Sequence, residues 1–256
     1  MKIITSKDNQ IYKKALKLTR KKYRDETGLY LLEGVKPLRD AVSMGISLTT
    51  VFLREDVETD IDIPEEKIVR LGRDLFDRLS ETENSQGVIA AAEKRSFSES
   101  EFTEMVSGGN ILIMDRLQDP GNIGTIIRTA EAAGYRGIMM ISGSGDVYSP
   151  KVVRAAAGSL FRMPVINVPD VSRAVQILEG TDMKIVVTSP DAQCSCFETD
   201  LTENTALVIG NEGSGVSREF IDASHLKVKI PMEGSIESLN AAVAAGILMY
   251  QSQKIK

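Results

Sequence analysis

The stretch that decides the fold is DRLQDPGNIGTIIRTAEAAGY, residues 115–135. It follows an apolar run, NILIMD at residues 110–115, that predicts a buried strand, and it then turns through Pro120 and Gly121 into a helix. A strand, a glycine turn and a helix commonly hold an anion or a nucleotide. The stretch contains neither G-x-G-x-x-G nor the lysine of a P-loop, so it predicts a binding site of another kind.

The sequence beyond this stretch repeats the alternation of apolar runs and helical patterns. Runs rich in Ile, Val and Leu, such as IVV and LVI, predict strands that are buried on both faces. Strands that alternate with helices predict a parallel sheet. We therefore expect an α/β domain over residues 110–256, with a mostly parallel sheet. The preceding residues, 97–109, are rich in Ser, Glu and Gly and are interpreted as a linker with a short helix.

A second, smaller α/β domain is expected over residues 1–96, where the pattern reads strand–helix–strand–strand–helix–strand. One strongly basic helix within residues 9–26 is predicted to precede these elements. The apolar face of that helix is expected to carry Ile11, Ala15 and Leu18, which recur at helical spacing.

Charge is distributed unevenly along the chain. The net charge of the 256 residues is −5, but residues 1–39 hold 11 Lys and Arg against four Asp and Glu. Residues 98–256 hold 13 basic against 19 acidic side chains. A basic segment on an acidic body is compatible with RNA contact at one end of the chain. A charge run is equally typical of a solvated helix face, so charge alone does not decide between the two.

Composition excludes several classes of protein. No run of roughly 18 apolar residues is present, so no membrane span is expected, and the absence of a signal-peptide pattern favours a cytoplasmic location. Cys194 and Cys196 are one residue apart and His225 is the single histidine, which argues against a metal site. A hydrolase triad would have to use His225, and the chain has no nucleophile elbow.

Three loops rich in Gly, Asn and Ser each follow a predicted strand: Pro120–Thr125, Gly210–Gly215 and Met232–Asn240. Ligands of open α/β sheets bind beyond the carboxyl ends of the strands. Glycines let the backbone approach a ligand and donate N–H groups to it. A single loop of this kind is usually only a turn, but the three together predict one shared pocket.

These loops lie in three motif blocks: NIGTIIRTAEAAG (122–134), LVIGNEGSGVS (207–217) and IPMEGSIESLNAAVAAGILMYQ (230–251). Their order, with roughly 90 residues between the first two, resembles the SpoU (TrmH-type) RNA ribose 2′-O-methyltransferases of the SPOUT class. YSPKVVRAAAGSLFRMPV, residues 148–165, is similar to the middle segment of that family. The resemblance covers about residues 110–253.

The resemblance implies features that periodicity does not show. It implies a deep C-terminal trefoil knot, which ordinary chain-topology rules make very rare. It also implies S-adenosylmethionine as methyl donor, a homodimer, no metal, and methyl transfer to a ribose 2′-hydroxyl of RNA. The N-terminal domain would be a substrate-binding domain similar to a small ribosomal-protein fold. That extra domain favours ribosomal RNA, and transfer RNA is the alternative.

The resemblance also implies site residues. The cofactor would be held by small or apolar residues in the knot loops, namely Thr188, Gly210, Ile230 and Leu239. Ile230 and Leu239 would form apolar walls for the adenine. The catalytic group would combine charged and amide or hydroxyl side chains, namely Arg128, Asn122, Glu212, Asn240 and Ser238.

Arg128 would bind the RNA phosphate and stabilise negative charge developing on the 2′-oxygen, because a guanidinium forks well onto phosphate and stays protonated. Asn122 would orient Arg128 or the substrate, and Glu212 would hold an arginine or the cofactor's surroundings. Ser238 is predicted as N-cap of the last helix. Asn240 would lie at the start of the same helix.

Lys151 and Arg154 of the middle segment would contact RNA phosphate or a dimer partner. Two other classes stay open from sequence alone. A non-catalytic RNA-binding dimeric scaffold would lack Asn122, Arg128 or Asn240, and all three are present. A nucleotide- or NAD-binding α/β enzyme would carry the G-x-G-x-x-G fingerprint, which is absent.

Overall fold

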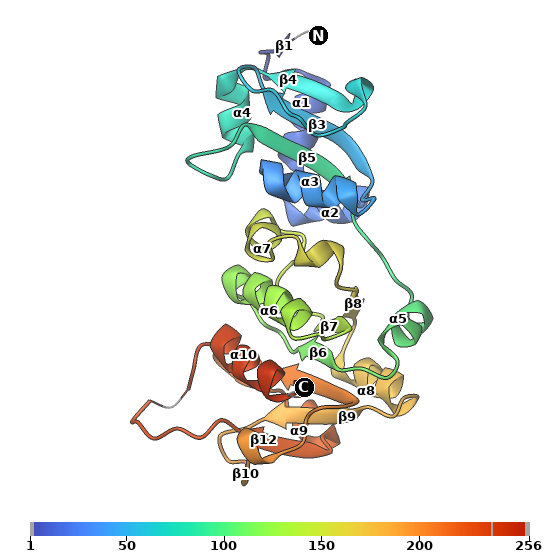
Figure 1. Ribbon diagram of the computed structural model, residues 1–256, viewed down its shortest axis with the longest axis vertical. Helices are drawn as coiled ribbons and strands as arrows, with labels where there is room; N and C mark the ends of the chain where they lie inside the picture. Colours follow the sequence, from blue (N-terminus) through green and yellow to red (C-terminus); the bar gives the residue numbers. More distant parts are fainter. Residues whose placement is uncertain (1–2, 237, 254–256) are drawn as a thin grey trace. The chain divides into compact units, whose positions relative to one another are not determined.

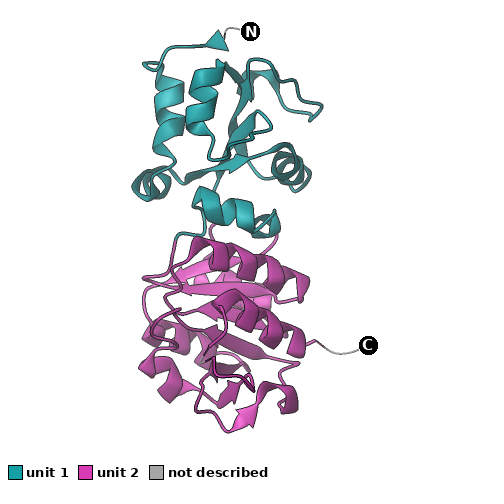
Figure 2. Ribbon diagram, turned by 90° about the vertical axis from the view of Figure 1, so that its left-hand side faces the viewer, with its two compact units in different colours: residues 1–95, 146–161 teal, residues 96–145, 162–256 magenta. Residues whose placement is uncertain are grey.

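The structure is a computed structural model that describes residues 3–236 and 238–253. Its chain divides into two compact units, coloured separately in Figure 2. Unit 1 comprises residues 1–95 and 146–161, and unit 2 comprises residues 96–145 and 162–256. The predicted boundaries stay a prediction, and these units differ from them by placing residues 146–161 in unit 1.

Unit 2 is built on a parallel sheet with the strand order β10-β12-β9-β11-β6-β7-β8, and every strand pairing described in it is parallel. The strands are β6 (Ile111–Met114), β7 (Gly137–Ile141), β8 (Val165–Val168), β9 (Lys184–Thr188), β10 (Cys194–Ser195), β11 (Thr205–Ile209) and β12 (Leu226–Lys229). The α/β fold with a mostly parallel sheet is confirmed. The trefoil knot stays a prediction.

Helices cover both faces of this sheet (Figure 1). They are α5 (Glu99–Val106), α6 (Pro120–Ala132), α8 (Val171–Glu179), α9 (Arg218–Ala223) and α10 (Ala241–Gln251), with a short 3-10 turn η3 (Cys196–Glu198). One face buries side chains of α5, α8 and α9 against alternate strand residues such as Ile113 and Val208. On the other face, α6 and α10 pack against each other. No helix in residues 3–236 or 238–253 is long and apolar enough to cross a membrane.

The segment predicted as a linker is largely part of unit 2. Ser98 and Glu101 form a capping box that starts α5. Phe102 and Val106 of this helix are fully buried in the core of the unit. Burial of these two side chains ties the segment to the sheet, so most of it does not act as a free tether.

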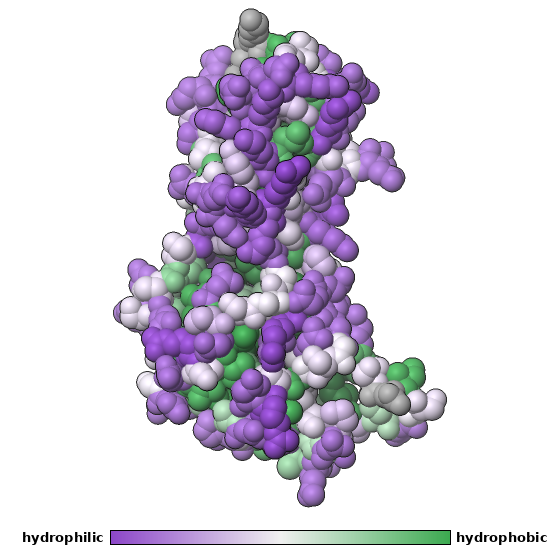
Figure 3. Space-filling model, turned by 180° about the vertical axis from the view of Figure 1, so that it is seen from behind, coloured by the Kyte–Doolittle hydropathy of each residue, from purple (hydrophilic) through white to green (hydrophobic). Residues whose placement is uncertain are grey.

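Unit 1 contains a mixed sheet with the strand order β1-β4-β3-β5-β2. Its strands are β1 (Ile3–Ile4), β2 (Leu29–Glu33), β3 (Leu48–Arg54), β4 (Ile68–Leu71) and β5 (Val88–Glu93). Its helices are α1 (Gln10–Lys17), α2 (Lys21–Thr27), α3 (Val35–Ser43), α4 (Arg73–Leu79) and α7 (Pro150–Ala155), with 3-10 turns η1 (Glu65–Lys67) and η2 (Ser159–Phe161). On the face shown in Figure 3, hydrophilic residues cover most of unit 1.

The prediction of one basic helix at the start of the chain was wrong. The chain breaks between α1 and α2, where Arg20 has an extended backbone (φ −101°, ψ 131°). Tyr12, Ala15 and Leu18 are buried, whereas Ile11 is 44% exposed. The buried stripe therefore begins one residue later than the sequence pattern indicated, because the ring of Tyr12 and not Ile11 fills the core of unit 1.

A buried ion pair fastens residues 146–161 within unit 1. The Nε and Nη2 atoms of Arg24 donate to Oδ2 of Asp146 at 2.9 and 2.6 Å. Nη1 of Arg24 donates to the carbonyl of Leu18 at 2.7 Å. The rings of Tyr30 and Tyr148 pack with centroids 4.8 Å apart. These contacts join α2 and β2 to a segment more than a hundred residues away in the sequence.

The Arg24–Asp146 pair should contribute strongly to stability. The Arg24 side chain is 3% exposed, so Arg24→Ala leaves the Asp146 carboxylate without its partner in nearly buried surroundings. We expect a loss of about 3–5 kcal/mol in the free energy of unfolding, measured by urea denaturation with a probe in unit 1. The control is Lys21→Ala, whose pair with Asp25 is exposed and should cost at most about 1 kcal/mol. Equal losses in the two variants would contradict the expectation.

Candidate active site

The carboxyl ends of four neighbouring parallel strands, β12, β9, β11 and β6, lie at one edge of the sheet. Thr188 ends β9, Gly210 follows β11 and Ile230 follows β12. The turn that opens α6 follows β6. The parallel topology therefore brings three of the four predicted cofactor residues and the first motif block to the same edge.

Glu212 joins the second motif block to the first. Its Oε2 atom accepts the backbone N–H of Gln118 at 3.1 Å. Its Oε1 atom accepts the N–H of Asp119 at 3.1 Å and the Nδ2 amide of Asn122 at 3.2 Å. Both oxygens of one carboxylate thus hold the turn that leads into α6.

Asn122 and Asn240 join the first block to the third. The Nδ2 atom of Asn240 donates to Oδ1 of Asn122 at 2.9 Å. The Oδ1 atom of Asn240 accepts the N–H groups of Ala242 and Val243 at 2.9 and 3.3 Å, which makes Asn240 the N-cap of α10.

Glu212, Asn122 and Asn240 form a chain of hydrogen bonds, called the relay below. The orientation of its two amide groups is determined from its two ends. A helix N–H only donates, so Asn240 must turn its oxygen toward α10 and its NH₂ group toward Asn122. Because the network places the pKa of Glu212 below its ordinary value, the carboxylate only accepts, so Asn122 must turn its NH₂ group toward Glu212. The relay leaves no freedom to flip either amide without losing hydrogen bonds.

The relay lies at the N-terminal ends of α6 and α10, where helix dipoles favour negative charge. Partial burial raises the pKa of Glu212, but N–H groups of Glu212, Asp119 and Gln118 and the Asn122 amide outweigh it. The pKa of this carboxyl therefore lies below its ordinary value. Glu212 is a fixed anion at neutral pH and not a proton donor.

Gly210 is required by the packing of its own loop. A Cβ atom on Gly210 would lie 2.2 Å from the backbone carbon of Gly215 and from the nitrogen of Val216. Asn211 closes the loop by accepting the N–H groups of Gly213 and Ser214 at 3.0 and 3.1 Å. Any larger residue at position 210 would push this loop away from the strand end.

Two predicted catalytic residues are not in the relay. Arg128 is exposed on α6 and makes no hydrogen bond or ion pair with any residue that the structure describes. Ser238 is exposed and does not cap α10; that prediction was wrong, because the helix starts two residues later than expected and Asn240 supplies the capping oxygen. Both side chains are open to a substrate.

Family comparisons agree with this geometry. A family model described as "SpoU rRNA Methylase family" matches residues 109–250, which is more than half of the chain. The chain belongs to the SpoU rRNA methylase family. A second model, described as "MRM3-like substrate binding domain", matches residues 9–90. The resemblance inferred from the three motif blocks is confirmed.

Relatives of this SpoU family chain match it over nearly its full length. It is 32% identical over 253 residues to the 23S rRNA (guanosine(2553)-2′-O)-methyltransferase RlmP of Bacillus subtilis, with 98% of each chain covered. It is 31% identical to a 23S rRNA (uridine(2479)-2′-O)-methyltransferase of Streptomyces viridochromogenes, covering 97% of this chain and 91% of the relative. The crystal structure of an AdoMet-bound rRNA methyltransferase from Sinorhizobium meliloti superposes with a TM-score of 0.86 at 28% identity, covering 98% and 97%.

The four residues that the family resemblance assigns to cofactor binding are suited to S-adenosylmethionine. Thr188, Gly210, Ile230 and Leu239 are all half-buried. Two apolar side chains and two small residues at strand ends offer an apolar surface for an adenine ring and backbone groups for its edge. The fixed carboxylate of Glu212 suits a cation such as a sulfonium. These residues therefore fit S-adenosylmethionine.

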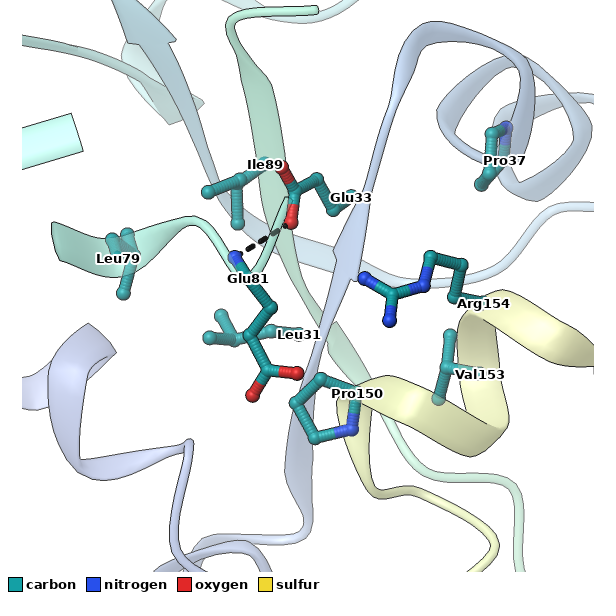
Figure 4. Close-up of a pocket in the computed structure, with 9 residues that line it drawn as sticks. All are labelled: Leu31, Glu33, Pro37, Leu79, Glu81, Ile89, Pro150, Val153 and Arg154. Carbon is teal, nitrogen blue, oxygen red and sulfur yellow. Dashed lines mark hydrogen bonds between the residues drawn. The ribbon is translucent and has the colours of Figure 1, made fainter. Parts of the chain in front are cut away.

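The pocket in Figure 4 belongs to unit 1 and contains none of these site residues. Arg154 of α7 points into it, and Glu33 accepts the backbone N–H of Glu81 at 3.1 Å. Its cavity of about 20 Å³ has room for about one water and excludes a nucleoside. Lys151, on the same helix, is exposed.

Asp115 is a site-building residue that sequence reasoning missed. Its side chain is fully buried at the end of β6, and Oδ2 accepts the N–H of Ser217 at 2.7 Å. It thereby fastens the far end of the loop that carries Glu212. An acid directly after a buried apolar run was the signal that could have found it.

His225 lies at the strand edge, where its Nδ1 atom accepts the N–H of Ile185 at 3.1 Å. The described residues hold no cluster of three or more metal-ligating side chains.

Asn240→Ala removes both the N-cap of α10 and the bond to Asn122. We expect it to lower the free energy of unfolding by about 1–2 kcal/mol in chemical denaturation. The matched control is Ser238→Ala, two residues earlier, which should stay within about 0.5 kcal/mol of the wild type. A larger loss in Ser238→Ala than in Asn240→Ala would show that the cap has been assigned to the wrong residue.

The lowered pKa of Glu212 makes its contribution pH-dependent. The carboxyl has a lower pKa folded than unfolded, so its stabilisation is complete above the unfolded pKa and is lost as pH falls through the folded pKa. Glu212→Gln should therefore cost on the order of 1 kcal/mol at neutral pH and progressively less in acid. Melting temperatures of both proteins between neutral and acidic pH test this, and a difference that grows toward acid would contradict it.

Proposed function

We propose that this chain transfers a methyl group from S-adenosylmethionine to a ribose 2′-hydroxyl of ribosomal RNA. The observation that carries the proposal is the Glu212–Asn122–Asn240 relay, which joins all three SpoU motif blocks at the strand ends. Relatives that match nearly the whole chain carry names for 2′-O-methylation of 23S rRNA. These full-length matches favour ribosomal over transfer RNA.

Thr188, Gly210, Ile230 and Leu239 hold the cofactor, with the two apolar side chains against its adenine. When bound, S-adenosylmethionine supplies an electrophilic methyl group on a positively charged sulfur. Glu212 stays ionised and fixes the turn before α6. Asn122 and Asn240 keep the starts of α6 and α10 together, so that the pocket is formed before RNA arrives.

Arg128 binds the phosphate of the target nucleotide. Its guanidinium is exposed and has no partner among the described residues, so no existing ion pair has to be broken. A guanidinium remains protonated in proteins, which excludes a role as general base. It stabilises the 2′-oxygen as its proton leaves for water or a phosphate oxygen. Ser238, which is also exposed, contacts the ribose of the target nucleotide.

Unit 1 supplies much of the affinity for RNA. Most of its cations on α1 and α2 are exposed, and Lys14 and Arg20 have no acidic partner among the described residues. We assign residues 1–96 to RNA binding, 97–109 to the connection and 110–256 to the knotted methyltransferase domain. We propose a cytoplasmic location, where the protein would meet ribosomal RNA.

A second copy of the chain completes the working unit as a homodimer. Val243 and Tyr250 on α10 are 52% and 55% exposed, and Phe197 on the neighbouring η3 is 54% exposed. Large apolar side chains that share one region of a surface mark an interface. An interface there would bury α10 on its open side, while its other side packs on α6.

Base selection is proposed to lie outside the relay, whose side chains bind one another and backbone groups. RlmP is named for a guanosine and the Streptomyces viridochromogenes relative for a uridine, at 32% and 31% identity. A relay that holds the loops together distinguishes neither base. We infer that unit 1, which holds the match to a substrate-binding domain, takes part in selecting the nucleotide.

Labelled S-adenosylmethionine and unmodified ribosomal RNA test the proposal. The wild type should yield 2′-O-methyl nucleotides, and Arg128→Ala should lower kcat/KM by about 100-fold or more, because one stabilising donor at the reacting oxygen is lost. The matched control is Arg218→Ala, which removes an exposed arginine on α9 and should retain full activity.

The same experiment separates an enzyme from a scaffold. Calorimetry with S-adenosylmethionine should give equal affinity for the wild type and Arg128→Ala. A protein that binds RNA but neither binds the cofactor nor methylates would be an RNA-binding scaffold. Incorporation into transfer RNA alone would shift the substrate class.

A further inference from the structure

Arg116, two residues after the end of β6, has a backbone conformation that its residue type disfavours. Its φ of 60° is in the left-handed region, shared in the described chain by only two other non-glycine residues, Ala157 and Asn204. Such conformations persist where the surrounding structure fixes them, and they gather at functional sites. Glycine or asparagine would adopt this conformation more readily, so an arginine here needs a reason.

Neighbouring loops hold the Arg116 backbone and the stem of its side chain. Its carbonyl accepts the Nδ2 amide of Asn211 at 2.8 Å, next to Glu212 in the second motif block. Its Nε atom donates to Oδ1 of the fully buried Asp115 at 3.0 Å. A Cβ atom on Gly143 would lie 3.3 Å from Cγ of Arg116, so the glycine leaves room for the stem.

The outer end of this side chain is open. The side chain is 46% exposed, and neither Nη atom makes a hydrogen bond or ion pair with any described residue. The Nε bond anchors one edge of the guanidinium and leaves both NH₂ groups without a described partner. An arginine whose Nε atom is anchored and whose two NH₂ groups are free loses little conformational entropy when it binds an anion.

The charges around Arg116 suggest a role for its two free NH₂ groups. The turn that follows Arg116 carries Asp119, and the carboxylate of Glu212 is bound to the same turn. A polyanion that approaches these two acids meets repulsion unless a cation offsets it. Arg128 is more than two helical turns further along the chain, so Arg116 is the cation that the loop itself provides.

We propose that Arg116 binds a phosphate of the RNA substrate and forms, with Arg128, a second point of attachment for the RNA backbone at the active site. This inference rests on the proposed methyltransferase function, which it deepens. Bidentate binding of a phosphate oxygen pair is the chemistry for which two free NH₂ groups on one guanidinium are suited. The contact positions RNA and takes no part in methyl transfer.

A purely structural role for Arg116 makes a different prediction. If it served only as the partner of buried Asp115, its variants would change stability but would leave RNA affinity and its salt dependence unchanged. Arg116→Lys and Arg116→Met provide a matched pair, because both side chains are unbranched and of similar length and both lack the Nε donor. Only the lysine carries a positive charge at its tip.

The experiment measures binding of an unmodified 23S rRNA transcript by both variants and the wild type as a function of salt, together with methyl-transfer kinetics, cofactor affinity and melting temperature. We expect Arg116→Met to raise the Kd and KM for RNA roughly tenfold and to lower the slope of log K against log salt by about one. Arg116→Lys should keep most of the slope. Cofactor affinity and kcat should be unchanged in both, and the melting temperatures report separately any loss of the contact with Asp115.

Equal RNA affinity and equal salt slopes in the Lys and Met variants would overturn the proposal and leave Arg116 a structural partner of Asp115. A change in kcat without a change in KM would also overturn it. If the wild type methylates the transcript while the two variants behave alike, only this inference fails. If the wild type binds the transcript but methylates no RNA, the proposed function fails; and if it binds none, both fail.

Discussion

The carboxylate of Glu212 is the point on which the active-site edge of this protein depends. It accepts hydrogen bonds from the turn before α6 and from Asn122, which in turn is bound by Asn240 at the start of α10. Three loops separated by many residues in the sequence thereby satisfy one another's polar groups. Without this anion, the backbone N–H groups of Gln118 and Asp119 would lose their partner, and the Asn122 amide would no longer link the second motif block to the third.

Much of the fold follows from local pattern. Apolar runs such as ILIM and LVI become central parallel strands, and Asp115 to Tyr135 becomes the strand end, turn and helix that its order of residues predicts. The departures have tertiary causes. The first helix breaks near Arg20 and buries Tyr12 in place of Ile11, because the core of unit 1 selects the larger ring. Helical periodicity alone does not contain that choice.

The site shows the same division. The motif blocks identify Asn122, Glu212 and Asn240, and the structure joins these three by hydrogen bonds. Residue type alone placed the cap of α10 at Ser238, because serine and asparagine are both good caps and their spacing does not decide between them. Asp115 escaped notice because its role depends on Ser217, about a hundred residues away. Side chains that build the site are fixed by hydrogen bonds, whereas Arg128 is exposed.

The division of unit 1 into two stretches of chain has a consequence for how such proteins can be recombined. Residues 146–161 lie between elements of unit 2 in the sequence, yet Asp146 is the partner of a nearly buried arginine in α2. Cutting the chain after residue 95 would remove the ion-pair partner of that arginine and uncover the ring of Tyr30. Residues 1–95 alone are therefore not a transplantable module. A chimera that exchanges the first 95 residues between relatives must carry the 146–161 segment with them, and natural exchange would have to change both stretches together.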